Sequence, residues 1–114
     1  MGAKVTGIFP TNNHRIRIKV CTRTLYIERK PDWLDRFVFY SVVYMRSDGA
    51  FLHSFQDDYN MRFTDVRVIR GIDNLHTFLN EQYSHNGTII PKDAIDHFES
   101  QILMSEICKK RKCF

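Results

Sequence analysis

The sequence predicts an α+β fold: an antiparallel sheet of about five or six strands, followed by two C-terminal helices packed on one face. Alternation of polar and apolar residues with period two dominates the first part of the chain, whereas a period of three to four residues takes over after Gly71. Turn-forming residues separate the periodic segments. The 114 residues fit one domain, 1–114, which ends in a basic tail at 109–114.

The first strands are expected at residues 4–9, 15–20 and 24–28. Pro10 and the polar residues that follow it end the first of them, because proline cannot donate a ladder hydrogen bond. The second alternates cleanly, which predicts one buried face and one face in water. Its polar side carries Arg15, Arg17 and Lys19, and its apolar side carries Ile16, Ile18 and Val20.

Residues 36–46 form the most apolar segment of the chain and are expected to be an inner strand, paired on both edges. Asp48-Gly49 then predicts a hairpin turn, followed by strands at 51–55 and 62–69. Strict alternation would place the apolar side chains of 36–46 on two faces. Phe37, Phe39, Val43 and Met45 would share one face, and Val38, Tyr40, Val42 and Tyr44 the other.

Two amphipathic helices are expected after Gly71. The apolar stripe of the first is Ile72, Leu75, Phe78, Leu79 and Tyr83, and that of the second is Ile95, Phe98 and Ile102. Pro91 suits the start of the second helix, and the basic residues 109–112 suit its end. The alternative architecture is a partly closed barrel with a C-terminal helix, as in pleckstrin-homology-like folds.

The net charge of +4 is concentrated in the sheet region and in the tail. Such a field favours an anionic partner, either nucleic acid or an acidic protein surface. Basic side chains and aromatic rings together hold single-stranded nucleic acid, through phosphate contacts and base stacking. The candidate basic residues are Arg15, Arg17, Lys19, Arg23, Arg62, Arg67, Lys109, Lys110, Arg111 and Lys112, with Arg29, Lys30 and Arg70 as extensions, and the candidate stacking rings are Tyr26, Trp33, Tyr40 and Tyr44.

The favoured interpretation is therefore a non-enzymatic protein that binds RNA or single-stranded DNA on a basic sheet face. The same pattern also fits a merely solvated strand face. The alternative function is a protein-interaction or inhibitory module that binds through a strand edge or an aromatic surface, and such edges also allow a homo-oligomer. In its low alanine and high phenylalanine content the chain resembles small viral or phage accessory proteins, which would bind a host or partner protein in this way.

No catalytic, cofactor or metal site is expected. Cys21, Cys108 and Cys113 are too widely spaced for the tight pairs of a zinc site, so we expect reduced, metal-free thiols. The five histidines are scattered, although a catalytic site assembled in space stays open. No apolar run has the length of a signal peptide or a membrane span, which predicts an intracellular protein without a membrane partner. The basic cluster at 109–112 fits a nuclear localisation signal or a helix cap.

Overall fold

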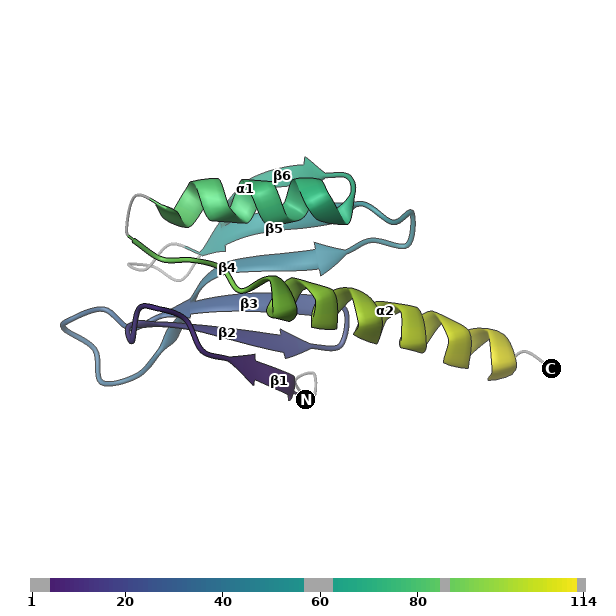
Figure 1. Cartoon of the computed structure of the whole chain (residues 1–114), viewed down its shortest axis with the longest axis horizontal. Coiled ribbons are helices and arrows are strands. Elements are labelled where there is room, and N and C mark those ends of the chain that lie inside the picture. Colours follow the sequence, from purple (N-terminus) through teal and green to yellow (C-terminus); the bar gives the residue numbers. More distant parts are fainter. Residues whose placement is uncertain (1–4, 57–62, 85–86, 113–114) are drawn as a thin grey trace.

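The computed structural model describes residues 5–56, 63–84 and 87–112, and it confirms the α+β fold (Figure 1). A six-stranded antiparallel sheet precedes two helices. The strands are β1 (Val5–Phe9), β2 (Ile16–Cys21), β3 (Thr24–Arg29), β4 (Val38–Met45), β5 (Phe51–Gln56) and β6 (Phe63–Ile69), and the helices are α1 (Ile72–Ser84) and α2 (Lys92–Lys112).

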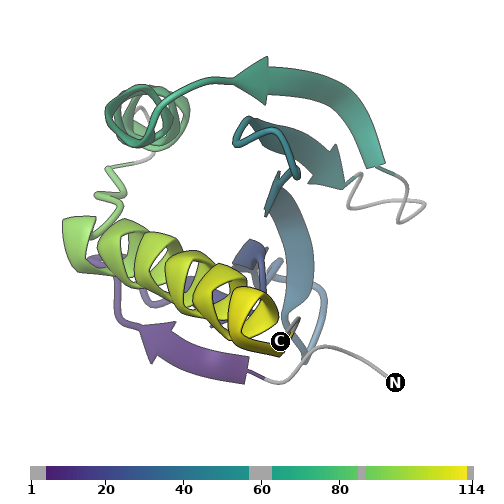
Figure 2. The same ribbon diagram turned by 90° about the vertical axis from the view of Figure 1, so that its right-hand side faces the viewer.

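The sheet is a simple meander in the order β1-β2-β3-β4-β5-β6, and each strand pairs with the next. Within the described ranges β1 and β6 are its two edges and do not pair with each other, so the sheet is open rather than a closed barrel. Figure 2 shows the sheet curling around the two helices, which both occupy its concave side. The convex side, called here the outer face, carries no helix.

The inner position of β4 is confirmed, because it pairs with β3 on one edge and with β5 on the other. The predicted division of its side chains between two faces is wrong. A register shift opposite Ile27 and Glu28 inserts one extra residue into β4, so Tyr40 and Ser41 both turn toward the helices. On the helix side lie Val38, Tyr40, Ser41, Val43 and Met45, whereas Phe39, Val42 and Tyr44 lie on the outer face.

The core lies between the concave face of the sheet and the helices. The alternation in β2 buries Ile16, Ile18 and Val20 as expected, and the apolar stripes of both helices belong to the same core cluster. Each such side chain contributes roughly 1.5–3 kcal/mol when it leaves water. The helical part of the core comprises Leu75, Leu79, Tyr83, Ala94, Ile95, Phe98 and Ile102.

Helix α2 is longer than the sheet, and its C-terminal part extends past the strands (Figure 1). Leu103 and Met104, where the helix leaves the sheet, are exposed. Neither described helix combines the length and apolar character that crossing a bilayer requires.

Candidate functional site

The basic stripe predicted on β2 is present on the outer face, but a buried carboxylate lies inside it. Glu28 on β3 faces Arg17 across the strand pair and is 3% exposed. Arg17 Nη2 lies 3.1 Å from Glu28 Oε1, and Lys19 Nζ lies 3.1 Å from Glu28 Oε2. The carboxylate therefore offsets part of the charge that the stripe would present to a ligand.

Aromatic rings surround these charges. The Arg17 guanidinium lies 4.4 Å from the centre of the Phe37 ring, and Lys19 Nζ lies 4.8 Å from that of Phe39. Tyr26 stacks on Phe39 with ring centres 4.5 Å apart. We call this set of six residues the outer-face cluster: Arg17, Lys19, Tyr26, Glu28, Phe37 and Phe39.

The other predicted basic residues do not extend this stripe. Arg23 occupies the β2–β3 turn with a φ of 59°, and its guanidinium donates to the carbonyl of Met45 at 3.2 Å. Arg67 lies over the ring of Phe78 on α1, and therefore on the helix side of the sheet. Arg62 lies outside the described residues, as do the side chains of Lys109, Lys110, Arg111 and Lys112 at the end of α2.

The four predicted stacking rings are also dispersed. Tyr26 and Tyr44 lie on the outer face, where Tyr44 is 43% exposed. Tyr40 lies on the helix side, because of the extra residue in β4. Trp33 is the most exposed ring, at 66%, in the loop between β3 and β4.

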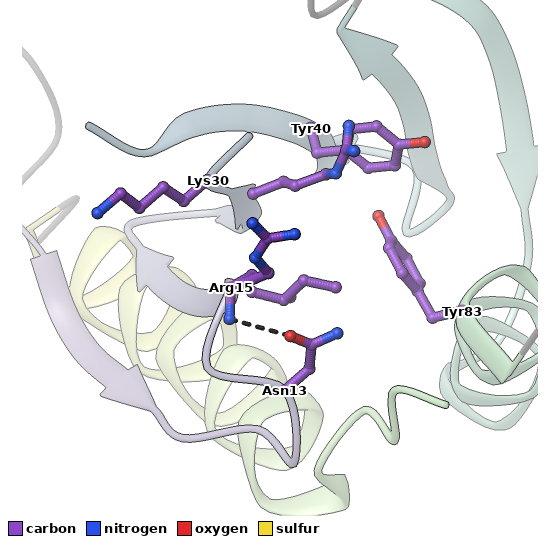
Figure 3. A pocket seen from close by; sticks show the side chains of 7 residues that line it. Asn13, Arg15, Lys30, Tyr40 and Tyr83 are labelled. Atoms are coloured by element: carbon purple, nitrogen blue, oxygen red, sulfur yellow. Dashed lines mark hydrogen bonds between the residues drawn. The ribbon is translucent and has the colours of Figure 1, made fainter. Parts of the chain in front are cut away.

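A second group of basic residues, among them Arg15 of the predicted stripe, lies at the end of the molecule where α1 ends. The loop before β2, the end of β3 and the start of β4 meet Tyr83 there, and they enclose a pocket of about 350 Å³ (Figure 3). We call it the basic pocket. It is lined by Asn13, Arg15, Ile16, Arg29, Lys30, Tyr40 and Tyr83.

Hydrogen bonds hold the loop that forms one wall of the pocket. Asn13 Oδ1 accepts from the backbone N–H of Arg15 at 3.0 Å, and the Arg15 carbonyl accepts from the N–H of Lys30 at 2.8 Å. Asn12 Oδ1 accepts from the N–H of Ile89 at 2.7 Å, which ties the loop to the segment between the helices. The basic residues are thus carried on an anchored backbone.

The opposite wall is aromatic and equally fixed. The hydroxyl of Tyr83 lies 2.6 Å from Ser41 Oγ, and the rings of Tyr83 and Tyr40 meet edge to face, 6.2 Å between centres. The guanidinium of Arg29 lies 5.4 Å from the centre of the Tyr40 ring. Arg29 therefore lines the pocket next to Tyr40.

The described lining residues carry three positive charges and no carboxylate. A carboxylate lies next to the pocket, because Asp32 pairs with Arg15 in an adjoining hollow of about 410 Å³. Guanidinium and ammonium groups bind anions through charge-assisted hydrogen bonds, so the lining suits an anionic ligand. We call this region, residues 13–16 and 29–33 together with Tyr40 and Tyr83, the basic end.

Sequence reasoning missed Asn13, Ile16 and Tyr83 and treated Arg29 and Lys30 only as extensions of a stripe. A signal for the last two was present, because Arg29-Lys30 stands between the end of a strand and Pro31. Basic residues at strand ends lie near the loops, where binding residues concentrate. Tyr83 gave no such signal, because its spacing is that of a core residue.

A second candidate site would involve the thiols and metal-ligating side chains of the described residues. Cys21 is a buried free thiol, and burial raises its pKa. The side chains of Cys108 and Cys113 lie outside the described residues. Over the described part of the chain, no three His, Cys, Asp or Glu side chains lie close enough to hold a metal ion.

Comparison of the chain with protein-family models, with curated proteins and with solved structures yields no match. The interpretation of the basic pocket therefore depends on its geometry and charge.

Proposed function

We propose that this protein is a non-enzymatic binding protein for RNA or single-stranded DNA and that the basic end is its contact surface. The observation that carries the proposal is that Arg15, Arg29 and Lys30 line one pocket without a carboxylate in its described lining, with the Lys30 side chain extending outward from its edge (Figure 3). Phosphate oxygens are the anionic groups that guanidinium and ammonium groups bind most readily in nucleic acids.

An exposed aromatic ring supports a single strand over a duplex. Trp33 projects from the loop that follows Lys30, and two-thirds of its surface is open to solvent. Unpaired bases stack on such rings irrespective of sequence, whereas paired bases are already stacked in the duplex. Phosphate contacts at the pocket and a base on Trp33 together provide both elements of single-strand binding.

The outer-face cluster is a weaker candidate for the same function. Its two cations already contact Glu28, and its rings are occupied by those cations and by each other. A phosphate there would have to compete with a carboxylate that cannot move into solvent. The basic end has its carboxylate, Asp32, on an exposed loop instead.

The test is fluorescence anisotropy with random-sequence single strands of RNA and DNA, at two salt concentrations. We expect steeply salt-dependent binding by the wild type. In R29Q/K30Q the plot of the logarithm of the association constant against that of the salt concentration should become shallower by about 1.4, using ~0.7 per phosphate contact. The matched control is R70Q/K92Q, which removes the same charge from exposed positions outside the basic end. An equal loss in both variants would reduce the effect to net charge and contradict the proposal.

A second candidate function is protein binding on the outer face of β4 to β6. Tyr44, Val66 and Val68 are exposed there, and no helix covers them. Exposed apolar residues gathered on one face often mark an interaction surface. Should the wild type bind no nucleic acid at either salt concentration, this function takes first place.

A further inference from the structure

We infer that the basic pocket receives a phosphate monoester at the end of a nucleic-acid strand, rather than a phosphodiester in its middle. The inference rests on the proposed function and specifies its ligand. Three properties of the pocket support it: the number of its donors, its closed inner wall and the spacing of its two tyrosines.

The donors match a terminal phosphate better than an internal one. Arg15 and Arg29 supply two guanidinium groups to one volume, and Lys30 lines its edge with its ammonium group pointing away from the two tyrosines (Figure 3). A phosphate monoester carries a charge of about −1.5 to −2 and three acceptor oxygens. A diester in the chain carries one negative charge and has only two unesterified oxygens. The two guanidinium groups, each with several N–H donors, are therefore better satisfied by the monoester.

The inner wall limits how a strand can enter. Tyr83 is 2% exposed and Ile16 is 7% exposed, and both line the pocket from the core side. The loop at Asn13, which is anchored through Asn12 to Ile89, closes a third side. An internal phosphate needs space for the chain on both sides, whereas a terminal phosphate needs only one opening.

The tyrosines leave no slot for a base. Their rings meet edge to face and Tyr83 is held by Ser41, so a base cannot slide between them without breaking a buried hydrogen bond. A volume of about 350 Å³ exceeds what a phosphate needs and leaves room for the sugar attached to it. The first base would then lie outside the pocket, on the side of the loop that carries Trp33.

The experiment compares one single-stranded oligonucleotide in four forms: with a 5′-phosphate, with a 3′-phosphate, with hydroxyls at both ends, and circularised. We expect one phosphorylated form to bind the wild type at least about tenfold more tightly than the hydroxyl form, because charge-assisted hydrogen bonds to a third oxygen are added. The circular form should bind like the hydroxyl form. R29Q/K30Q should lose the preference for the phosphorylated end, and R70Q/K92Q should keep it.

The outcomes separate this inference from the proposed function. Equal affinity for all four forms would overturn the terminal site and leave single-strand binding intact, whereas no binding of any form would overturn the proposed function itself. Competition by a free nucleoside monophosphate as tight as the phosphorylated strand would assign the pocket to free nucleotides and overturn the strand-end inference. The comparison of the four forms uses the wild type, so it decides the question even if R29Q/K30Q does not fold.

Discussion

The outer-face cluster and the basic end contain the same kinds of residue and differ in what surrounds the charges. In the cluster, Arg17 and Lys19 both contact a carboxylate that is almost fully buried. At the basic end, Arg15 pairs with an exposed aspartate, and the pocket beside it holds no carboxylate in its described lining. The cations of the cluster are therefore already paired within the sheet, whereas the basic end is the region for which we propose a ligand.

The difference shows that a basic stripe is defined by its cross-strand neighbours as much as by its own residues. When β2 is considered without its neighbours, Arg17 and Lys19 fit either a solvated face or a ligand-binding face. The neighbouring strand adds Glu28 between them, and this nearly buried carboxylate already occupies both cations. Each prediction below tests whether the two regions differ as described.

The largest expected effect is the loss of stability on removing the cations of the outer-face cluster. R17Q/K19Q leaves Glu28 buried without a positive partner, and breaking a buried pair in this way costs about 3–5 kcal/mol. The half-exposure of Arg17 favours the lower end of that range. Urea unfolding measures the change in stability. A loss of this size would show that Arg17 and Lys19 are not a dispensable solvated surface.

The control for that loss is R17Q/K19Q/E28Q, which removes the stranded charge as well. It should recover most of the stability, because glutamine is not charged when buried. A double mutant as stable as the wild type would show that the cluster has no structural role and would return Arg17 and Lys19 to the list of ligand contacts.

The next effect concerns His53, a buried polar residue with no compensating partner. Its ring is fully buried between Phe55 and Phe78, and among the described residues neither ring nitrogen has a hydrogen-bond partner. Burial, assisted by the charge of Arg67, lowers the pKa of His53 to about 4 from an ordinary value near 6.5. Glu28 keeps two cations beside it, whereas His53 has no carboxylate partner that would favour its charged form.

This shift predicts that acid destabilises the fold. Between pH 6.5 and 4 the unfolded chain binds a proton at His53 that the folded chain does not, so stability declines as the pH falls through this range. At ~1.4 kcal/mol per pH unit the loss reaches about 3 kcal/mol near pH 4. Urea unfolding across this range should show a flatter pH dependence in H53F than in the wild type. H14Q, which changes an exposed histidine, should retain the wild-type slope.

A smaller effect is expected from removing the exposed ring at the basic end. W33A should weaken single-strand binding by about 1 kcal/mol or more, the value of one stacked base, and should change stability by less than about 0.5 kcal/mol. The matched control is Y44A, which removes an exposed ring from the outer face. Equal losses of affinity in both variants would show that the two regions do not differ in stacking.

The sequence predicted most of the fold because alternation and helical spacing are local. It did not predict the extra residue in β4, because apolar side chains on both faces of residues 36–46 leave no polar marker of which face each one takes. The position of Glu28 opposite Arg17 could have been predicted from the sequence. A two-residue turn at Thr22–Arg23 pairs Cys21 with Thr24, and the same register places Arg17 opposite Glu28.

The basic pocket was not predictable in the same way. Its residues come from three strands, the loops before β2 and after β3, and a helix, and Tyr83 is far from Asn13 in the sequence. Their convergence depends on the curvature of the sheet and on where α1 ends, which are properties of the packed structure (Figure 2). Local patterns carry no information on either.

The smallest expected effect comes from Asp32, whose carboxylate pairs with Arg15 beside the basic pocket. Both side chains are substantially exposed, so the pair adds little stability and competes with a phosphate only modestly. D32N should therefore tighten single-strand binding by roughly two- to fivefold and steepen its salt slope, because Arg15 becomes available for a phosphate. D96N is the matched control, since it removes the same charge from another exposed pair, Lys92–Asp96. If D96N tightened binding equally, the effect would be one of net charge. If D32N instead weakened binding, Asp32 would be holding Arg15 in its binding position. A gain in D32N alone would show that the one carboxylate at the basic end limits binding there, whereas in the outer-face cluster the carboxylate is part of the fold.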